Sequence, residues 1–176
     1  MAFNIFVKKE KAQPPGFVTD KKYIKASAKL NACADLAKKD SAVVFITWCP
    51  ETTRKFKTFF TENNIAENRV IESRQLHAAL VADKTIVFAE HYPLHGKELE
   101  LVKNLVQDHF MVFSAMDEPL FKHFGSENMI QLMKLLGLKD EEAIEHSFVS
   151  KSIINGKAKI AETVTVKQSP HAQPGW

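Results

Sequence analysis

The chain has 176 residues, 45% hydrophobic and 26% charged, with a formal net charge of +3. This balance is typical of a globular protein and excludes a disordered or fibrous one. Apolar runs fall short of the ~20 residues of a membrane-spanning helix, and residues 1–7 lack the flanks of a secretion signal, so we expect a cytoplasmic protein without an integral membrane segment. Two cysteines, Cys33 and Cys49, provide neither a disulfide framework nor a four-ligand zinc pattern.

The positive charge is concentrated near the N-terminus. Lysines between Lys21 and Lys39 alternate with apolar residues such as Tyr23 and Leu30 at helical spacing, which predicts the solvated face of a helix. The sequence has neither an aromatic-rich basic strand nor a recognition-helix pattern, so we expect no nucleic-acid partner.

The first elements are an irregular arm, a helix and a buried strand. Residues 1–18 contain adjacent prolines and little periodicity, which predicts the arm. Thr19 or Asp20 can cap a helix that runs to about Lys39. Residues 42–48 are continuously apolar or β-branched, which predicts a central strand covered by helices on both faces.

Helix and strand patterns alternate through the middle of the chain. Periodic apolar residues predict helices, and short apolar runs predict the strands between them. In chain order we expect a helix over residues 50–64, a strand over 69–72, a helix over 74–83, a strand over 85–89, a helix over 97–108 and a strand over 110–114. This alternation implies right-handed crossovers and a largely parallel sheet.

The C-terminal part is predicted to be helical. Two helices end at Gly125 and Gly137, where a left-handed residue suits a helix end. The acids that begin at Asp140 suit the opening turn of a further helix. The tail from Gly156 contains one alternating piece, residues 163–166, and is expected to form a short edge strand or to be mobile.

These elements predict an α/β fold with a mostly parallel four- to five-stranded sheet, flanked by helices and followed by a helical C-terminal extension. The expected organisation is an N-terminal arm over residues 1–18, a single domain over 19–155 and a tail over 156–176.

The candidate ligand-binding residues follow two of the predicted strands, because open α/β sheets bind ligands beyond the carboxyl ends of their strands. They are Cys49, Thr52, Thr53, Glu90, His91, His95 and Lys97. Two histidines four positions apart would share a helix face, but Pro93 lies between them. We therefore expect a pocket-lining loop with local hydrogen bonds and no tightly held metal, and a metal centre at this loop is the alternative.

The segment from Trp48 to Glu51 resembles the active-site turn of thioredoxin-like and glutaredoxin-like proteins. A Cys49 thiol at a helix N-terminus would have a low pKa. Thr52 stands where the resolving cysteine of a dithiol site would be. We expect Cys49 to react faster than Cys33 without a catalytic cycle.

The sequence contains neither a glycine-rich phosphate loop nor a Gly-x-Ser-x-Gly motif. We therefore expect no cofactor and no hydrolase triad.

The C-terminal half resembles the end of the second nucleotide-binding domain of the SecA preprotein-translocase ATPase family. The shared features are an acidic pair at 117–118, Phe-Gly-Ser at 124–126, Leu-Met at 132–133, Leu-Gly at 136–137, Ile-Glu-His at 144–146 and a helix core at 149–153. A weaker agreement at 22–23 and 42–53 extends the resemblance to about residues 20–155. The resemblance implies a RecA-like sheet.

The chain also departs from the family at the positions of ATP chemistry. The family has a Gly-Arg-Gly-Thr-Asp motif and an arginine-rich segment, whereas the last arginine here is Arg74 and Lys97 begins the corresponding helix. Lysine lacks the planar fork that stabilises a transferring phosphoryl group. We therefore expect no ATPase activity from the isolated chain.

The resemblance and its departures together favour a non-catalytic binding or regulatory module with a translocation-related protein partner. Two alternatives stay open. One is a small enzyme, either a monothiol redox protein using Cys49 or a hydrolase or metal enzyme using Glu90, His91 and His95. The other is a subunit that completes the ATP site of another chain.

Overall fold

The computed structural model describes residues 18–105, 107, 110–122, 125–135, 137–144 and 147–163. In this part of the chain strands and helices alternate before a helical C-terminal region. The elements are β1 (Val18–Tyr23), α1 (Ala26–Lys39), β2 (Val43–Thr47), α2 (Pro50–Glu62), β3 (Val70–Glu72), β4 (Thr85–Phe88), α3 (His95–Lys103), β5 (Phe110–Ala115), α4 (Pro119–Lys122), α5 (Ser126–Leu135) and α6 (Ser147–Thr163). Short 3₁₀ turns lie at Glu67–Arg69, Ser73–Gln75 and Ala78–Leu80.

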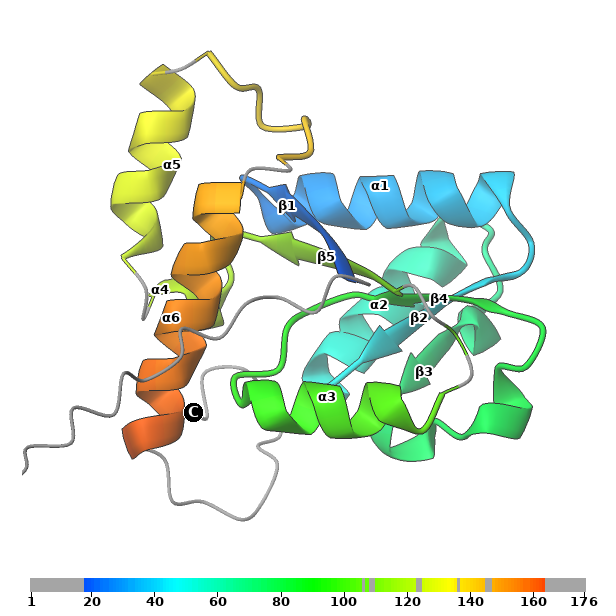
Figure 1. Ribbon diagram of the computed structural model, residues 1–176. Coiled ribbons are helices and arrows are strands. Elements are labelled where there is room, and N and C mark those ends of the chain that lie inside the picture. Colours follow the sequence, from blue (N-terminus) through cyan, green and yellow to red (C-terminus); the bar gives the residue numbers. More distant parts are fainter. Residues whose placement is uncertain are drawn as a thin grey trace, which may run out of the picture.

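The five strands form one parallel sheet in the order β1-β5-β4-β2-β3, with helices on both faces (Figure 1). The prediction of an α/β fold with a mostly parallel sheet of four to five strands is confirmed. The arrangement is consistent with a RecA-like fold. The strands β2, β4 and β5 are the three expected from apolar runs, and β2 lies between β4 and β3.

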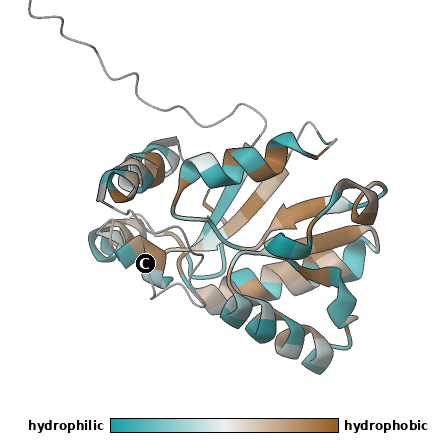
Figure 2. Cartoon of the chain, turned by 90° about the horizontal axis from the view of Figure 1, so that it is seen from below, coloured by the Kyte–Doolittle hydropathy of each residue, from teal (hydrophilic) through white to brown (hydrophobic). Residues whose placement is uncertain are grey.

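The two faces of the sheet carry separate apolar clusters. Val43 and Phe45 of β2 face α1 and α2, whereas Val44 and Ile46 face α3, because successive residues of a strand point to opposite sides. All of β2 is buried as a result. The hydropathy colouring shows apolar strands between helices with hydrophilic outer faces (Figure 2).

The C-terminal helices form a third cluster beside the sheet. Met116, Phe121, Met133 and Val149 are among its buried members. Gly125 and Gly137 have φ values of 71° and 80°, as expected for left-handed residues at helix ends. This unit therefore has a core of its own, and α6 extends from it to contact α3.

The prediction of a helix from Thr19 or Asp20 is wrong at its beginning. Val18–Tyr23 is a strand that pairs with β5, and the helix starts at Ala26. Asp20 and Lys22 point to the side of α6 and bond to partners there. Charged residues thus occupy the face of β1 that points toward α6. For this reason the sequence of β1 lacks the alternation of apolar and polar residues that usually indicates a strand.

The expected helix over residues 74–83 is also wrong, since only the two 3₁₀ turns at Ser73–Gln75 and Ala78–Leu80 form there. Val81 is buried, but Leu80 is 42% exposed. The segment lacks the continuous apolar stripe that would hold a helix on the sheet.

Residues 156–163 belong to α6 and do not form the expected edge strand or mobile tail. The acids from Asp140 lie in a turn, and Ile144 then forms an antiparallel bridge to Lys22 before α6 begins. The arm up to residue 17 and the expected strand residues 164–166 lie outside the described residues, and the domain limits stay a prediction. In the part of the chain that the structure describes, no helix is long and apolar enough to cross a membrane.

Candidate functional site

The candidate site lies at the carboxyl ends of β2 and β4. These strands are neighbours, but the chain continues from β2 to β3 at one edge and from β4 to β5 on the other side. Such a point of reversal is where parallel α/β sheets open a crevice for ligands. Here the N-terminus of α2 and residues Glu90 and His91 lie at this point of the sheet.

The Glu90 carboxylate occupies the N-terminus of α2. Its Oε1 accepts hydrogen bonds from the backbone N–H groups of Trp48 at 2.7 Å and Cys49 at 3.0 Å, and its Oε2 accepts one from the Thr52 hydroxyl at 2.8 Å. The side chain is fully buried. Cys49, at the N-cap of α2, makes no side-chain cap bond of its own. Glu90 therefore supplies the negative charge that a helix N-terminus favours.

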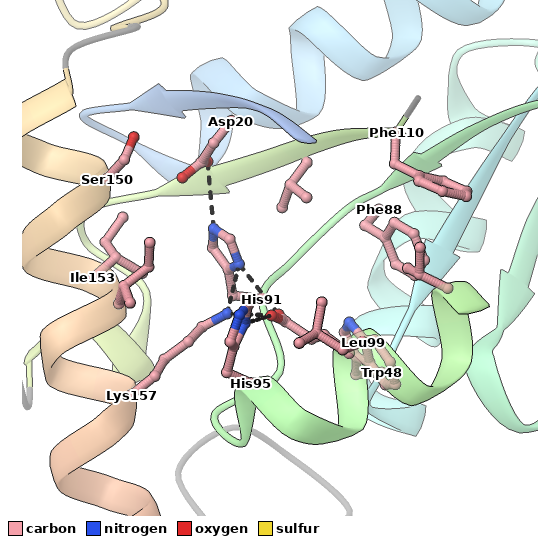
Figure 3. Close-up of a pocket in the computed structure, with 14 residues that line it drawn as sticks. Asp20, Trp48, Phe88, His91, His95, Leu99, Phe110, Ser150, Ile153 and Lys157 are labelled. Atoms are coloured by element: carbon pink, nitrogen blue, oxygen red, sulfur yellow. Dashed lines mark hydrogen bonds and ion pairs between the residues drawn. The ribbon is translucent and has the colours of Figure 1, made fainter. Parts of the chain in front are cut away.

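His91 turns to the opposite side, toward α3 and α6. Its Nε2 lies 3.3 Å from Asp20 Oδ1, and its Nδ1 lies 3.2 Å from Glu98 Oε1 and 2.9 Å from Lys157 Nζ (Figure 3). Lys157 also donates to Glu98 Oε2 at 2.5 Å. We call Asp20, His91, Glu98 and Lys157 the buried network; it joins β1, the loop after β4, α3 and α6.

Glu98 fixes the loop that presents both histidines. Its Oε1 accepts the backbone N–H of Tyr92 at 2.7 Å, and its Oε2 lies 3.3 Å from His95 Nδ1. A helical carboxylate thus reaches back to the residues before its own helix, much as in a capping box. The local bonding expected for His95 is present, whereas His91 bonds to groups distant in the sequence.

Opposite charges in the buried network stabilise one another, whereas its two cations, His91 and Lys157, repel each other. Burial raises the pKa of Glu98, but Lys157 and the two histidines outweigh it and hold that pKa well below its ordinary value. Burial also raises the pKa of Asp20, but His91 and Lys22 outweigh this effect and lower the pKa of Asp20 below its ordinary value. Burial and the Lys157 ammonium oppose a charged imidazole, but Asp20 and Glu98 prevail and raise the pKa of His91.

The raised pKa of His91 predicts a stability that declines with rising pH. Because the folded chain holds this proton more tightly, the contribution is complete below the ordinary pKa of 6.5 and is lost as the pH passes the folded value. We expect His91→Gln to destabilise the protein most near pH ~5 and least near pH ~9. The carboxylates of Asp20 and Glu98 remain ionised over this whole range. Urea unfolding across this range tests the prediction.

His77→Gln is the matched control, because His77 is exposed and lies outside the buried network. A difference between wild type and His91→Gln that is equal at all pH values would contradict the assigned proton linkage.

An apolar cavity of about 110 Å³ adjoins the buried network between α3, α6 and the sheet. We call it the α6 cavity. Its apolar walls include Phe88, Val102, Val112 and Ile153, and Trp48 lies at one side (Figure 3). The location fits the expected pocket-lining role of the loop after β4.

Cys49 does not have the environment of a reactive thiol. Burial first, and then the Glu90 carboxylate, raises its pKa strongly. The low pKa expected from a helix N-terminus is therefore wrong, since Glu90 already occupies that position. Burial also raises the pKa of Cys33, to about 12. Both thiols are buried, an environment that disfavours thiolate chemistry, and the monothiol redox alternative stays a prediction.

The structure separates the predicted site residues into different surroundings. Cys49, Thr52 and Glu90 meet at the N-terminus of α2. Thr53 instead lies 2.7 Å from the Thr47 hydroxyl and donates to the Cys49 carbonyl, so it fastens the first turn of α2 to β2. Lys97 is 60% exposed and pairs with Glu100.

Several residues of the buried network are absent from the sequence-based prediction. The sequence pattern places Asp20 at a helix start, Lys157 in a tail and Glu98 on a helix face. One usable signal was the spacing of Val149, Ile153 and Lys157, which continues one helix face past Gly156. Among the described residues, no group of three or more His, Cys, Asp or Glu side chains could hold a metal ion.

Comparison with known proteins finds similarity to translocase subunits over a short segment, and no family model matches the chain. Over 48 residues, 27% of this chain, it is 46% identical to the protein translocase subunit SecA of Acidithiobacillus ferrooxidans. The same length is 40% identical to SecA of Psychrobacter cryohalolentis and 35% identical to SecA of Acinetobacter baumannii. The matched segment spans only 5% of each of these relatives.

Proposed function

We propose that the chain is a non-catalytic SecA-like module, with one domain over residues 19–155, that binds a partner protein of the translocation machinery in the cytoplasm. The short similarity to SecA subunits and the parallel α/β sheet support this proposal. The resemblance falls mainly on residues 113–153, which include the separate C-terminal cluster.

The non-catalytic part rests on the position of Glu90. A phosphate group binds a helix N-terminus through backbone N–H groups and the helix dipole. At the reversal point of this sheet, the buried Glu90 carboxylate accepts those N–H groups instead. A second negative charge there would be repelled and would find its donors taken. The chain therefore closes the crevice in which a nucleotide phosphate would be held.

The sequence agrees with a closed crevice. Phosphoryl transfer needs a phosphate-cradling loop with its lysine, acids for Mg²⁺ and water, and arginines near the γ-phosphate. The sequence has no such loop, and no arginine follows Arg74. An absent arginine finger alone lowers the rate by about 10³ to 10⁵.

ATP hydrolysis by the purified full chain tests this part. Phosphate release with Mg²⁺ is expected at the buffer background and unchanged in Lys97→Ala, whose exposed side chain pairs with Glu100. Turnover above ~0.01 per second, the order of a GTPase with its arginine in place, that falls in Glu90→Gln would overturn it.

Replacing Glu90 itself should weaken the fold. Glu90→Gln keeps the size but removes a charge bonded to three donors, so we expect a loss of about 1.5–3 kcal/mol in the free energy of unfolding. Chemical denaturation measures this loss. Glu51→Gln is the control, because Glu51 lies in the same helix turn but is 34% exposed and pairs with Lys55; a loss equal to that of the control would refute the capping role.

Direct binding tests the partner. The exposed leucines of α5, Leu132 at 53% and Leu135 at 84%, provide apolar contact positions on the C-terminal unit. Purified chain with a photo-crosslinking residue at 135 is expected to crosslink to purified SecA, and the same residue placed at the exposed Lys38 of α1 is expected not to. Absence of a crosslink and of any measurable affinity for SecA or its membrane channel would refute the translocation part of the proposal.

A further inference from the structure

The walls of the α6 cavity are apolar, but two buried polar atoms of its lining residues, Trp48 Nε1 and His91 Nε2, have no hydrogen-bond partner among the described residues. His91 Nε2 still faces a counter-charge, Asp20 Oδ1 at 3.3 Å, whereas the indole N–H of Trp48 has none in the part of the chain that the structure describes. The indole ring is held by Phe88, stacked with ring centroids 5.8 Å apart, and by Tyr92 at 4.8 Å. A buried indole N–H normally finds an acceptor. This donor is therefore a feature that a bound molecule could complete.

The charged residues at the other side of the cavity need no ligand charge. Glu98 is paired with both His91 and Lys157, and Asp20 is paired with both His91 and Lys22. A charged ligand would have to lose its hydration among apolar walls without an unpaired counter-charge. The cavity is therefore suited to an uncharged molecule.

The size of the cavity limits the ligand to about one ring. The cavity of about 110 Å³ is somewhat smaller than the ~150 Å³ apolar cavity known to accept benzene. Aromatic side chains from different strands, Phe88 and Phe110, lie in its wall. A more open depression beside it, lined in part by His95, Ile154 and Lys157, shares these residues with the cavity.

We propose that the α6 cavity binds a small, uncharged aromatic molecule with one hydrogen-bond acceptor, which takes the proton of the Trp48 indole N–H. The ring fills the space between the sheet and α6, and the acceptor faces Trp48. This site is separate from the proposed translocation function and does not depend on it.

Fluorine NMR with the full chain tests the site with three probes: 4-fluorophenol, fluorobenzene and 1-fluoronaphthalene. Saturable binding of 4-fluorophenol is expected with a dissociation constant of about 1 mM, as for a ligand of this few atoms. Fluorobenzene should bind more weakly, because it offers no good acceptor. The naphthalene should not bind, because its second ring exceeds the cavity.

Two variants distinguish the cavity from its donor. Val102→Phe fills the cavity and should weaken 4-fluorophenol binding at least tenfold, whereas Leu132→Phe on the exposed face of α5 should leave it unchanged. Trp48→Phe removes the N–H together with one ring of the indole, so fluorobenzene serves as the control for the change of shape; 4-fluorophenol should be weakened about 2- to 10-fold more than fluorobenzene.

The proposal is wrong if 4-fluorophenol shows no saturable binding up to about ten times the expected constant, or if the naphthalene binds equally well. Binding that survives Val102→Phe places the probe elsewhere and also overturns it. Equal weakening of both probes in Trp48→Phe refutes the hydrogen bond. Should Val102→Phe fail to fold, the naphthalene and Trp48→Phe measurements still decide.

Discussion

Replacing Phe45 by alanine is expected to lower the free energy of unfolding by about 3–5 kcal/mol. Phe45 lies in the middle of β2, opposite Val70 of β3 and Val87 of β4, and its exposed fraction is 0%. Its ring meets the edge of Phe60 from α2, with centroids 5.3 Å apart. Alanine would leave a cavity surrounded by strands on both sides and a helix above, where little can move to fill it.

Urea or guanidinium unfolding of wild type and Phe45→Ala measures this loss. Phe59→Ala is the control, because Phe59 lies on the same helix as Phe60 but is only partly buried at the margin of the cluster. Its loss should be clearly smaller. A loss below about 1 kcal/mol for Phe45→Ala would place β2 at the periphery of the fold and contradict the central position of this strand.

The elements that the sequence predicts best are those whose apolar pattern is not interrupted. The runs that became β2, β4 and β5 are buried along most of their length, and burial on both faces requires a continuous apolar sequence. The helix that begins at Pro50 was also identified with nearly correct bounds, since proline at the first turn and the spacing of Phe56 and Phe60 both favour it.

The elements that the sequence did not predict are those with charged residues facing inward. β1 carries Asp20 and Lys22 on a buried face, and α6 carries Lys157, which is only 2% exposed. Patterns of hydrophobicity treat each of these residues as solvent-facing. Their burial is possible because each meets an opposite charge: Lys22 meets Asp20 on the same strand, whereas Asp20 and Lys157 meet His91 and Glu98 from distant parts of the chain.

The candidate site shows the same limit. Glu90, His91 and His95 were found because they follow a predicted strand. The partners of His91 were not found, because they are distant in the sequence. Asp20 lies on β1, whereas His91 follows β4, and Lys157 lies 66 positions after His91. The order of the strands in the sheet decides which side chains meet at the strand ends. The local spacing of residues along the chain does not predict that order.

The buried pair of Lys29 and Glu118 carries the second large expected effect. Lys29 Nζ bonds directly to the Glu118 carboxylate and donates to the carbonyl of Ala89 at 2.6 Å, and the two side chains are 2% and 9% exposed. Lys29 comes from α1, Ala89 follows β4 and Glu118 follows β5. One ammonium therefore links the ends of two strands to a helix on the sheet.

Breaking this pair from one side should be costly. Lys29→Met leaves the Glu118 carboxylate buried without its counter-charge, and such a break typically lowers the free energy of unfolding by about 3–5 kcal/mol. Burial opposes the charged lysine, yet Glu118 raises the pKa of Lys29, so the ammonium is the form that the pair stabilises. Glu118→Gln should be costly for the converse reason, because it leaves that ammonium with neutral partners.

A double-mutant cycle separates this pairing from simple loss of packing. The double variant Lys29→Met/Glu118→Gln contains neither buried charge, and glutamine can still accept from the Ala115 N–H that now bonds to Glu118 at 3.2 Å. Its loss of stability should therefore be smaller than the sum of the two single losses by about 1–3 kcal/mol. Burial raises the pKa of Glu118 even beside Lys29, and loss of the ammonium raises it further, so the cost of Lys29→Met alone should shrink as the pH falls toward the ordinary glutamate pKa of 4.5 and be smallest below it, where Glu118 is protonated in both the folded and the unfolded chain. Additive losses with no pH dependence would mean that Lys29 acts through the packing of its side chain, whose Nζ lies 5.3 Å from the centroid of the Phe56 ring, and that the ion pair does not hold these strand ends together.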